Sequence, residues 1–128
     1  MTATVFIADD NLADVDLIQF AFSENNLNVD FIVASDGPQA IGLLQTVLPT
    51  LILLDIKMPG ADGFEVLDYL RSQPRLDDVH VIIMSSSNAR VDHDRALKLG
   101  ASEHWPKPAR FDDTVRLIGT LRQFVIDT

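Results

Sequence analysis

Five polar side chains stand at the ends of short segments that can form strands. They are Asp9 and Asp10 after residues 4–8, Asp55 after 51–54, Ser85 after 79–84, and Lys107 after 102–105 with one proline between. Carboxylates held close together in a partly buried site repel one another strongly, so a cluster of three implies a bound cation. Oxygen ligands with room for water and substrate oxygens suit Mg²⁺ rather than Zn²⁺.

The same five groups have the chemistry needed for phosphoryl transfer. One carboxylate can attack a phosphoryl group and form an acyl phosphate. A metal and a lysine can neutralise charge on the transferring oxygens, while a hydroxyl donates a hydrogen bond to one of them. This chemistry requires that the five side chains meet at one place.

Apolar runs alternate with amphipathic stretches from end to end, without repeats or linkers. Strands are expected at 4–8, 28–34, 51–54, 79–84 and 102–105, and helices at 11–25, 36–48, 62–73, 89–99 and 111–126. Continuous apolar runs are typical of strands covered on both faces. The pattern predicts an α/β fold, a doubly wound parallel sheet of the flavodoxin-like (βα)5 type with strand order 2-1-3-4-5. Ligand sites of such sheets lie at the carboxyl ends of the strands, where the five side chains stand.

Several local signals support these helices. Helix starts and ends are indicated by Asp36 as N-cap with Pro38, by Asp62 with Glu65 as a capping box, and by Gly100 after residue 99. These residue types at these positions satisfy the free backbone groups of helix ends or tolerate their geometry. In helix 11–25 one stripe is expected to face the sheet: Ala13, Leu17, Phe20 and Ala21.

Length and composition restrict the class of protein. The chain has 128 residues, 47% of them apolar, and no cysteine, which predicts one domain (1–128) without disulfides or an output domain. No apolar run approaches the roughly 20 residues of a membrane span. The N-terminus lacks a basic region before its apolar stretch and does not resemble a signal peptide, so a cytoplasmic location without membrane association is expected.

The chain is strongly acidic, with a net charge of −9. Nucleic-acid binding depends on Lys and Arg that neutralise phosphates, so this charge argues against it. Protein partners are expected instead. Solubility alone explains the charge outside the motifs equally well.

Over essentially its whole length the chain resembles the receiver domains of two-component response regulators, of the single-domain type similar to the chemotaxis regulator. The matching motifs are Asp9-Asp10, Asp55-Ile56-Lys57-Met58-Pro59 with Gly63, Ser85, and Lys107-Pro108. Each is weak alone, but together and in order they are specific. The opening at 9–14 is also similar to a subgroup that includes phytochrome-associated regulators, which tend to dimerise.

This resemblance implies a role for each matching residue. Asp55 would be the phosphoacceptor, phosphorylated by a histidine kinase or a phosphotransfer protein, with Ser85 and Lys107 assisting. Mg²⁺ would bind to Asp10 directly, to Asp9 mostly through water, to Asp55, and to the backbone carbonyl of Lys57. The Lys107–Pro108 peptide would be cis. The protein would promote only its own phosphorylation and dephosphorylation rather than act as an enzyme on other substrates.

The resemblance also implies an output surface made by helix 89–99, strand 102–105 and helix 111–126, which would contact a downstream protein or a second copy of the chain. The last helix carries two apolar lines: Val115, Ile118 and Val125, and Leu117, Leu121 and Phe124. Core burial explains most of this wide apolar face, and a dimer contact would explain the rest.

Three positions near the motifs leave alternatives open. His104 stands where the receiver switch usually has an aromatic residue; its flat ring can pack inward, but an exposed histidine is an equal alternative. Trp105 is expected in the core, and Pro106 is expected to shorten the fifth strand. In the run 85–87, Ser86 rather than Ser85 could be the switch hydroxyl.

Two other functions compete with the phosphorylated switch. A Mg²⁺-dependent phosphatase of the haloacid-dehalogenase type also uses an aspartate at a strand end, but it needs a second aspartate where this chain has Lys57. A receiver-like binding module that takes no phosphate would not need the complete set of motif residues.

Overall fold

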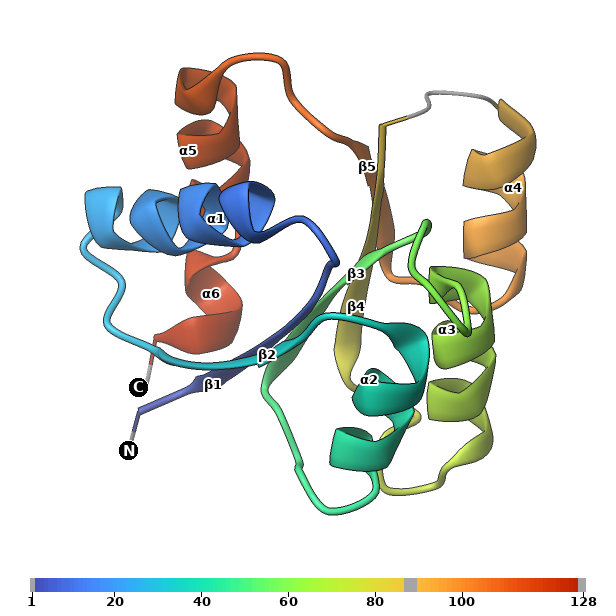
Figure 1. The fold of residues 1–128 in the computed structure, drawn as a ribbon. Helices are drawn as coiled ribbons and strands as arrows, with labels where there is room; N and C mark the ends of the chain where they lie inside the picture. Colours follow the sequence, from blue (N-terminus) through green and yellow to red (C-terminus); the bar gives the residue numbers. More distant parts are fainter. Residues whose placement is uncertain (1, 87–89, 127–128) are drawn as a thin grey trace.

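The structure, a computed structural model, describes residues 2–86 and 90–126 and contains one five-stranded parallel sheet between two layers of helices (Figure 1). The strands are β1 (Thr4–Ala8), β2 (Asp30–Ala34), β3 (Leu51–Asp55), β4 (His80–Ser85) and β5 (Glu103–Pro106). The helices are α1 (Leu12–Glu24), α2 (Gly37–Leu44), α3 (Gly63–Ser72), α4 (Arg90–Lys98), α5 (Phe111–Gly119) and α6 (Arg122–Val125). The strand order is β2-β1-β3-β4-β5, which confirms the predicted flavodoxin-like fold.

Both faces of the sheet are buried, as the continuous apolar runs predicted. Alternate residues of β3 serve the two faces, because successive side chains of a strand point in opposite directions. Ile52 and Leu54 pack with α2, α3 and α4, whereas Leu51 and Leu53 pack with α1, α5 and α6. Figure 1 shows these two groups of helices on opposite sides of the sheet. Each such side chain contributes about 1.5–3 kcal/mol on burial, so the central strands are held firmly in register.

The predicted N-caps Asp36 and Asp62 and the predicted glycine after α4 are present. The Asp36 side chain accepts a hydrogen bond from the Gln39 backbone N–H at the start of α2, and Asp62 accepts one from the Glu65 N–H at the start of α3. Gly100 has a φ of 102° after α4, a conformation that favours glycine. These caps fix where the helices begin and end relative to the strands.

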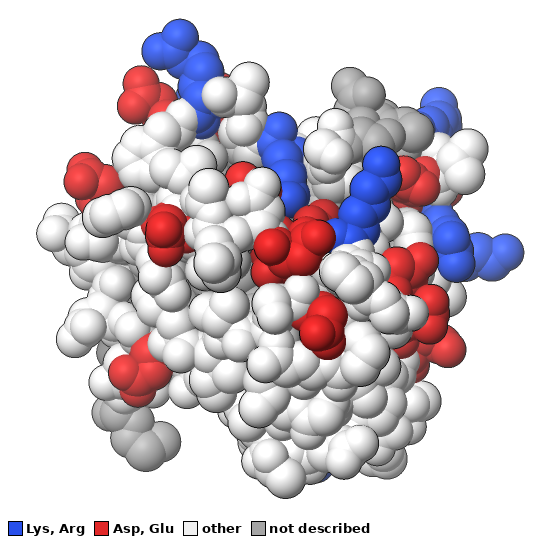
Figure 2. Space-filling view, in the orientation of Figure 1, with Lys and Arg blue, Asp and Glu red and all other residues white. Residues whose placement is uncertain are grey.

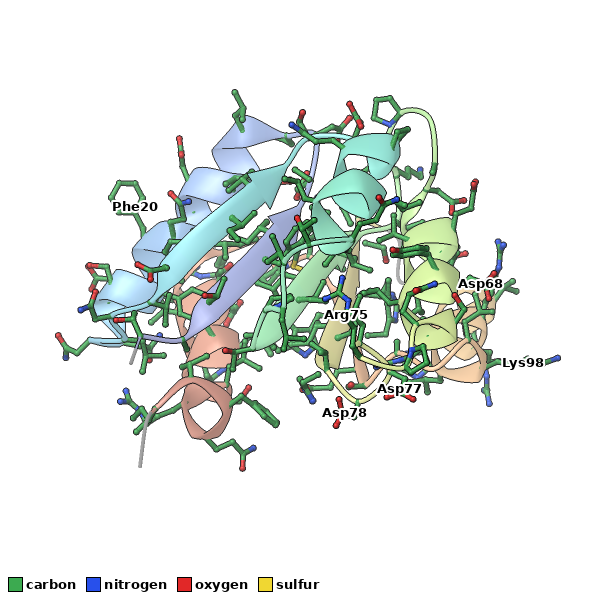
Figure 3. All side chains as sticks on the ribbon, turned by 90° about the horizontal axis from the view of Figure 1, so that it is seen from below. Phe20, Asp68, Arg75, Asp77, Asp78 and Lys98 are labelled. Carbon is green, nitrogen blue, oxygen red and sulfur yellow. The ribbon has the colours of Figure 1, made fainter. Side chains whose placement is uncertain are left out.

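The predicted buried stripe of α1 is wrong in part. Ala21 is buried, but Leu17 and Phe20 are 44% and 63% exposed, and Ala13 is exposed as well. Phe20 points away from the sheet (Figure 3). The buried side chains of α1 are Val15, Ile18, Ala21 and Phe22. Apolar residues surround much of this helix, so spacing alone did not select the face that packs on the sheet.

The predicted last helix, 111–126, is interrupted. α5 ends at Gly119, and the backbone N–H groups of Thr120 and Leu121 bond three residues back, to Leu117 and Ile118. The Thr120 hydroxyl also donates to the Leu117 carbonyl, at 2.6 Å. This tight turn separates α5 from α6. The helix α2 also ends earlier than predicted, at Leu44 rather than at 48.

No helix among residues 2–86 and 90–126 combines the length and the apolar character needed to cross a membrane.

Candidate functional site

Three carboxylates meet at the carboxyl ends of β1 and β3. Ala8 of β1 pairs with Leu54 of β3, so the residues that follow, Asp9 and Asp55, lie side by side. One oxygen from each of Asp9, Asp10 and Asp55 lies within 4.8 Å of the others. Asp9 and Asp55 are buried, whereas Asp10 is exposed. Figure 2 shows acidic side chains gathered at the middle of one face of the molecule, with basic side chains beside them.

The buried carboxylate of Asp9 is costly to keep charged. Burial raises the pKa of Asp9 to about 6, and the neighbouring charge of Asp55 adds to the rise. The hydrogen bond from the Asn11 N–H, at 2.9 Å, and the charge of Lys107 oppose it. A divalent cation would relieve this cost, and the ligand atoms offered are carboxylate oxygens, as Mg²⁺ requires. The donor set therefore fits the predicted metal.

Lys107 reaches into this cluster from the segment after β5. Its Nζ lies 3.2 Å from both Asp9 Oδ2 and Asp55 Oδ2 and 2.7 Å from Asp14 Oδ2. Burial alone would lower the pKa of Lys107, but the Asp14 hydrogen bond and the charges of Asp9 and Asp55 outweigh it and raise that pKa. The side chain is therefore a fixed positive charge beside Asp55.

Asp14 is a member of the site that sequence reasoning missed. It lies in the first turn of α1, which begins at the Asn11 cap, whose side chain accepts from the Ala13 and Asp14 N–H groups. This places Asp14 close to the end of β1. Its position three residues after a helix cap at a strand end was the available signal.

The loop after β3 carries the remaining motif residues. The Lys57 N–H donates to Asp55 Oδ1 at 3.4 Å; the role of the Lys57 carbonyl as a metal ligand stays a prediction. Gly63 is required by close packing, because a Cβ there would lie 2.4 Å from the Asp55 carbonyl oxygen. All peptide bonds between described residues are trans, so the cis Lys107–Pro108 bond implied by the resemblance is wrong. Trans is the lower-energy form of bonds before proline.

Ser85 ends β4 beside the carboxylates. Asp55 pairs with Met84, so Ser85 lies one residue beyond the strand partner of Asp55. Ser85 is buried, whereas Ser86 is exposed. The Ser85 Oγ lies 3.0 Å from His104 Nε2. The structure thus favours Ser85 over Ser86 as the hydroxyl that faces the interior.

His104 packs inward, which resolves the alternative left open by the sequence. His104 is only 9% exposed, and its second ring nitrogen, Nδ1, lies 3.0 Å from His93 Nδ1 of α4. Burial, and then the proximity of His93, lower the pKa of His104. A neutral imidazole therefore connects Ser85 to α4.

The neighbours of His104 are structural. Trp105 is 8% exposed, as predicted, and its Nε1 donates to Glu103 Oε1. Pro106 is the last residue of the four-residue strand β5, at the sheet edge where proline is tolerated.

In the last helices, all six apolar residues of the two predicted lines belong to the core or pack against it: Val115, Leu117, Ile118, Leu121, Phe124 and Val125. Core burial thus accounts for the wide apolar face.

Comparisons with known proteins agree with this geometry. Residues 5–119 match the family model of the response regulator receiver domain. The response regulator PleD of Caulobacter vibrioides is 34% identical over 122 residues, which cover 95% of this chain and 26% of PleD. The chain thus spans about a quarter of the length of that curated relative.

Two solved structures of single response regulators are similar over nearly their whole length. The phosphorylated cyanobacterial phytochrome response regulator RcpA is 27% identical with a TM-score of 0.89, covering 98% of this chain and 94% of RcpA. The Mn²⁺-bound response regulator Rcp1 is 25% identical with a TM-score of 0.85, covering 95% and 93%. Phytochrome regulators are thus among the similar structures, as the segment 9–14 indicated. Sequence, fold and the strand-end carboxylates together place this chain in the response regulator receiver domain family of two-component signalling proteins.

Proposed function

We propose that the chain is a phosphorylated switch: Asp55 accepts a phosphoryl group from a histidine kinase or a phosphotransfer protein, with Mg²⁺ as cofactor. The observation that carries this proposal is the convergence of Asp9, Asp10 and Asp55 within 4.8 Å, with the Lys107 ammonium 3.2 Å from Asp55. The phosphorylation of RcpA and the Mn²⁺ of Rcp1 support it by analogy.

Each side chain has a defined part in the transfer. A carboxylate oxygen of Asp55 forms a bond to phosphorus as the bond from phosphorus to the donor's histidine nitrogen breaks, and that nitrogen leaves with the electron pair. Lys107 neutralises charge on Asp55 and on the transferring oxygens, and the Ser85 hydroxyl donates to one of them. Asp14 holds Lys107 in place from α1.

The metal would be held by Asp10 and Asp55, by Asp9 mostly through water, and by the Lys57 carbonyl. When bound, Mg²⁺ neutralises charge on the transferring phosphoryl group. The three carboxylates would hold the metal at the end of β3. The raised pKa of Asp9 reflects burial and repulsion from Asp55, both of which a cation would offset.

The phosphorylated state would be read at a surface made by α4, β5 and α5, by a downstream protein or by a second copy of the chain. The contact from Ser85 to His104 supports this route, because it joins the strand beside Asp55 to β5. The expectation that the chain acts without an output domain stays a prediction.

A phosphatase function is not favoured, because Lys57 occupies the position where the haloacid-dehalogenase type needs its second aspartate.

Intact-mass measurement after acetyl phosphate treatment tests the proposal that Asp55 is phosphorylated. One phosphoryl group should be added with Mg²⁺ and almost none with EDTA, and Asp55→Asn should abolish the addition. Asp62→Asn, which alters a helix cap outside the cluster, is the matched control. A chain that gains no mass with Mg²⁺, or that gains it equally in Asp55→Asn, would overturn the proposal.

A further inference from the structure

Three polar groups from three elements form a continuous chain that ends on α4. Ser85 Oγ of β4 lies 3.0 Å from His104 Nε2 of β5, and His104 Nδ1 lies 3.0 Å from His93 Nδ1 of α4. The rings of the two histidines have centroids 5.1 Å apart. Both distances are those of hydrogen bonds, so each contact needs one donor and one acceptor.

The donors and acceptors of these two hydrogen bonds can be arranged in two directions. In the first, the Ser85 hydroxyl donates to His104 Nε2, and His104 Nδ1–H donates to His93. In the second, His93 Nδ1–H donates to His104 Nδ1, and His104 Nε2–H donates to the Ser85 oxygen. A neutral imidazole has one N–H, so a single choice at His104 fixes both hydrogen bonds.

Only the second direction is compatible with phosphoryl binding by Ser85. A hydroxyl has one hydrogen and two lone pairs. If that hydrogen is given to His104, it cannot also be given to a phosphoryl oxygen on Asp55. If His104 donates instead, the hydroxyl accepts on one side and donates on the other.

We propose that His93 is a positioning residue of the switch: by donating from Nδ1 it fixes the His104 tautomer that directs the Ser85 hydrogen toward the phosphorylation site. This inference rests on the proposed function for the role of Ser85. His93 is exposed, whereas His104 is buried. An imidazolium donates from both nitrogens and a neutral imidazole donates from one, so His93 can donate from Nδ1 in two protonation states but accept there in only one.

Charged side chains of α4 lie near the two histidines. Arg90, Asp94 and Pro106 line a groove of about 540 Å³ with the two rings. Asp92 of α4 carries a charge that acts on His104, and β4 contributes the neutral Ser85. Two protonated rings at 3.0 Å would face each other with hydrogens only, so the contact persists while His104 stays neutral.

Long-range ¹H–¹⁵N spectra of the imidazole nitrogens test the assignment in the unphosphorylated protein. His104 should carry its hydrogen on Nε2, and His93 should carry one on Nδ1. A His104 hydrogen on Nδ1 would overturn the inference. This readout needs no phosphorylation, so it stands even if the chain gains no phosphoryl group and the proposed function fails.

Variants of His93 provide the second readout. His93→Ala should lower the rate of phosphorylation by acetyl phosphate about fivefold, the effect of one lost hydrogen bond, and should mix the His104 tautomers. His93→Asn should restore both, because the amide N–H of asparagine occupies the place of imidazole Nδ1–H. Lys98→Ala, an exposed change on the same helix, is the control. Equal rates and an unchanged His104 tautomer in His93→Ala would refute the role of His93. If that variant does not fold, the wild-type tautomers still decide.

Discussion

Replacing Asp9 by asparagine should make the metal-free protein more stable, although it removes a member of the proposed site. The Asp9 side chain is fully buried, and its pKa rises from 3.8 to about 6 through burial and the charge of Asp55. A difference of about 2 pKa units corresponds to roughly 3 kcal/mol, at about 1.36 kcal/mol per unit. This value already includes the attraction of Lys107. We therefore expect a gain in unfolding free energy on the order of 2–3 kcal/mol at pH 8 in EDTA.

The sign of the pH dependence follows from the raised pKa. An acid whose folded pKa lies above its unfolded value destabilises the fold above that folded pKa, here about 6, and the penalty is lost as pH falls toward the unfolded value. The advantage of Asp9→Asn should thus be largest at pH 8 and nearly absent at pH 4. Mg²⁺ should stabilise the wild type and have less effect on the variant, because ligand binding to the folded state adds to its stability.

Urea unfolding at several pH values measures these differences, provided the slope with denaturant is unchanged. Asp16→Asn, which removes an equal charge from the exposed face of α1, is the matched control and should change stability little. An Asp9→Asn protein that is no more stable than the wild type at pH 8 in EDTA would refute the reasoning.

Three further predictions concern neighbouring parts of the structure. Asp14→Asn removes the negative charge that lies 2.7 Å from the Lys107 ammonium and should slow phosphorylation by acetyl phosphate severalfold; an unchanged rate would show that the Asp14 charge does not position the lysine. Because burial and a neighbouring ring lower the pKa of His104, the unfolded chain gains its proton first as pH falls, so stability should drop below about pH 6.5. His104→Phe should flatten that drop in thermal melts, and an equal slope would contradict this. Arg71→Lys should cost about 2 kcal/mol in urea unfolding, because the guanidinium donates to carbonyls in the loops before β4 and β5; a loss near zero would count against this role.

Much of the fold could be predicted because burial on both faces leaves a simple pattern. Runs such as 51–54 contain apolar residues only, so no choice between faces had to be made. α1 required that choice, and its additional apolar residues, Leu17 and Phe20, led to the wrong face. The interruption after Gly119 depends on local hydrogen bonds of Thr120 that apolar spacing does not reveal.

The placement of the motif residues was predictable for a topological reason. Parallel strands bring their carboxyl ends to one edge, so Asp9, Asp55 and Lys107 had to approach one another. Contacts from helices were not predictable in this way. Asp14 depends on the direction in which α1 leaves β1, and His93 meets His104 across 11 residues that no motif links.

The central claim is that Asp55 itself receives the phosphoryl group. After treatment with acetyl phosphate and Mg²⁺, borohydride reduction converts an aspartyl phosphate to homoserine, and tandem mass spectrometry of the peptides locates the change. We expect homoserine at position 55, and at no other aspartate, with none in samples treated without Mg²⁺. Homoserine at another position, or a phosphorylated protein with an intact Asp55, would contradict the account.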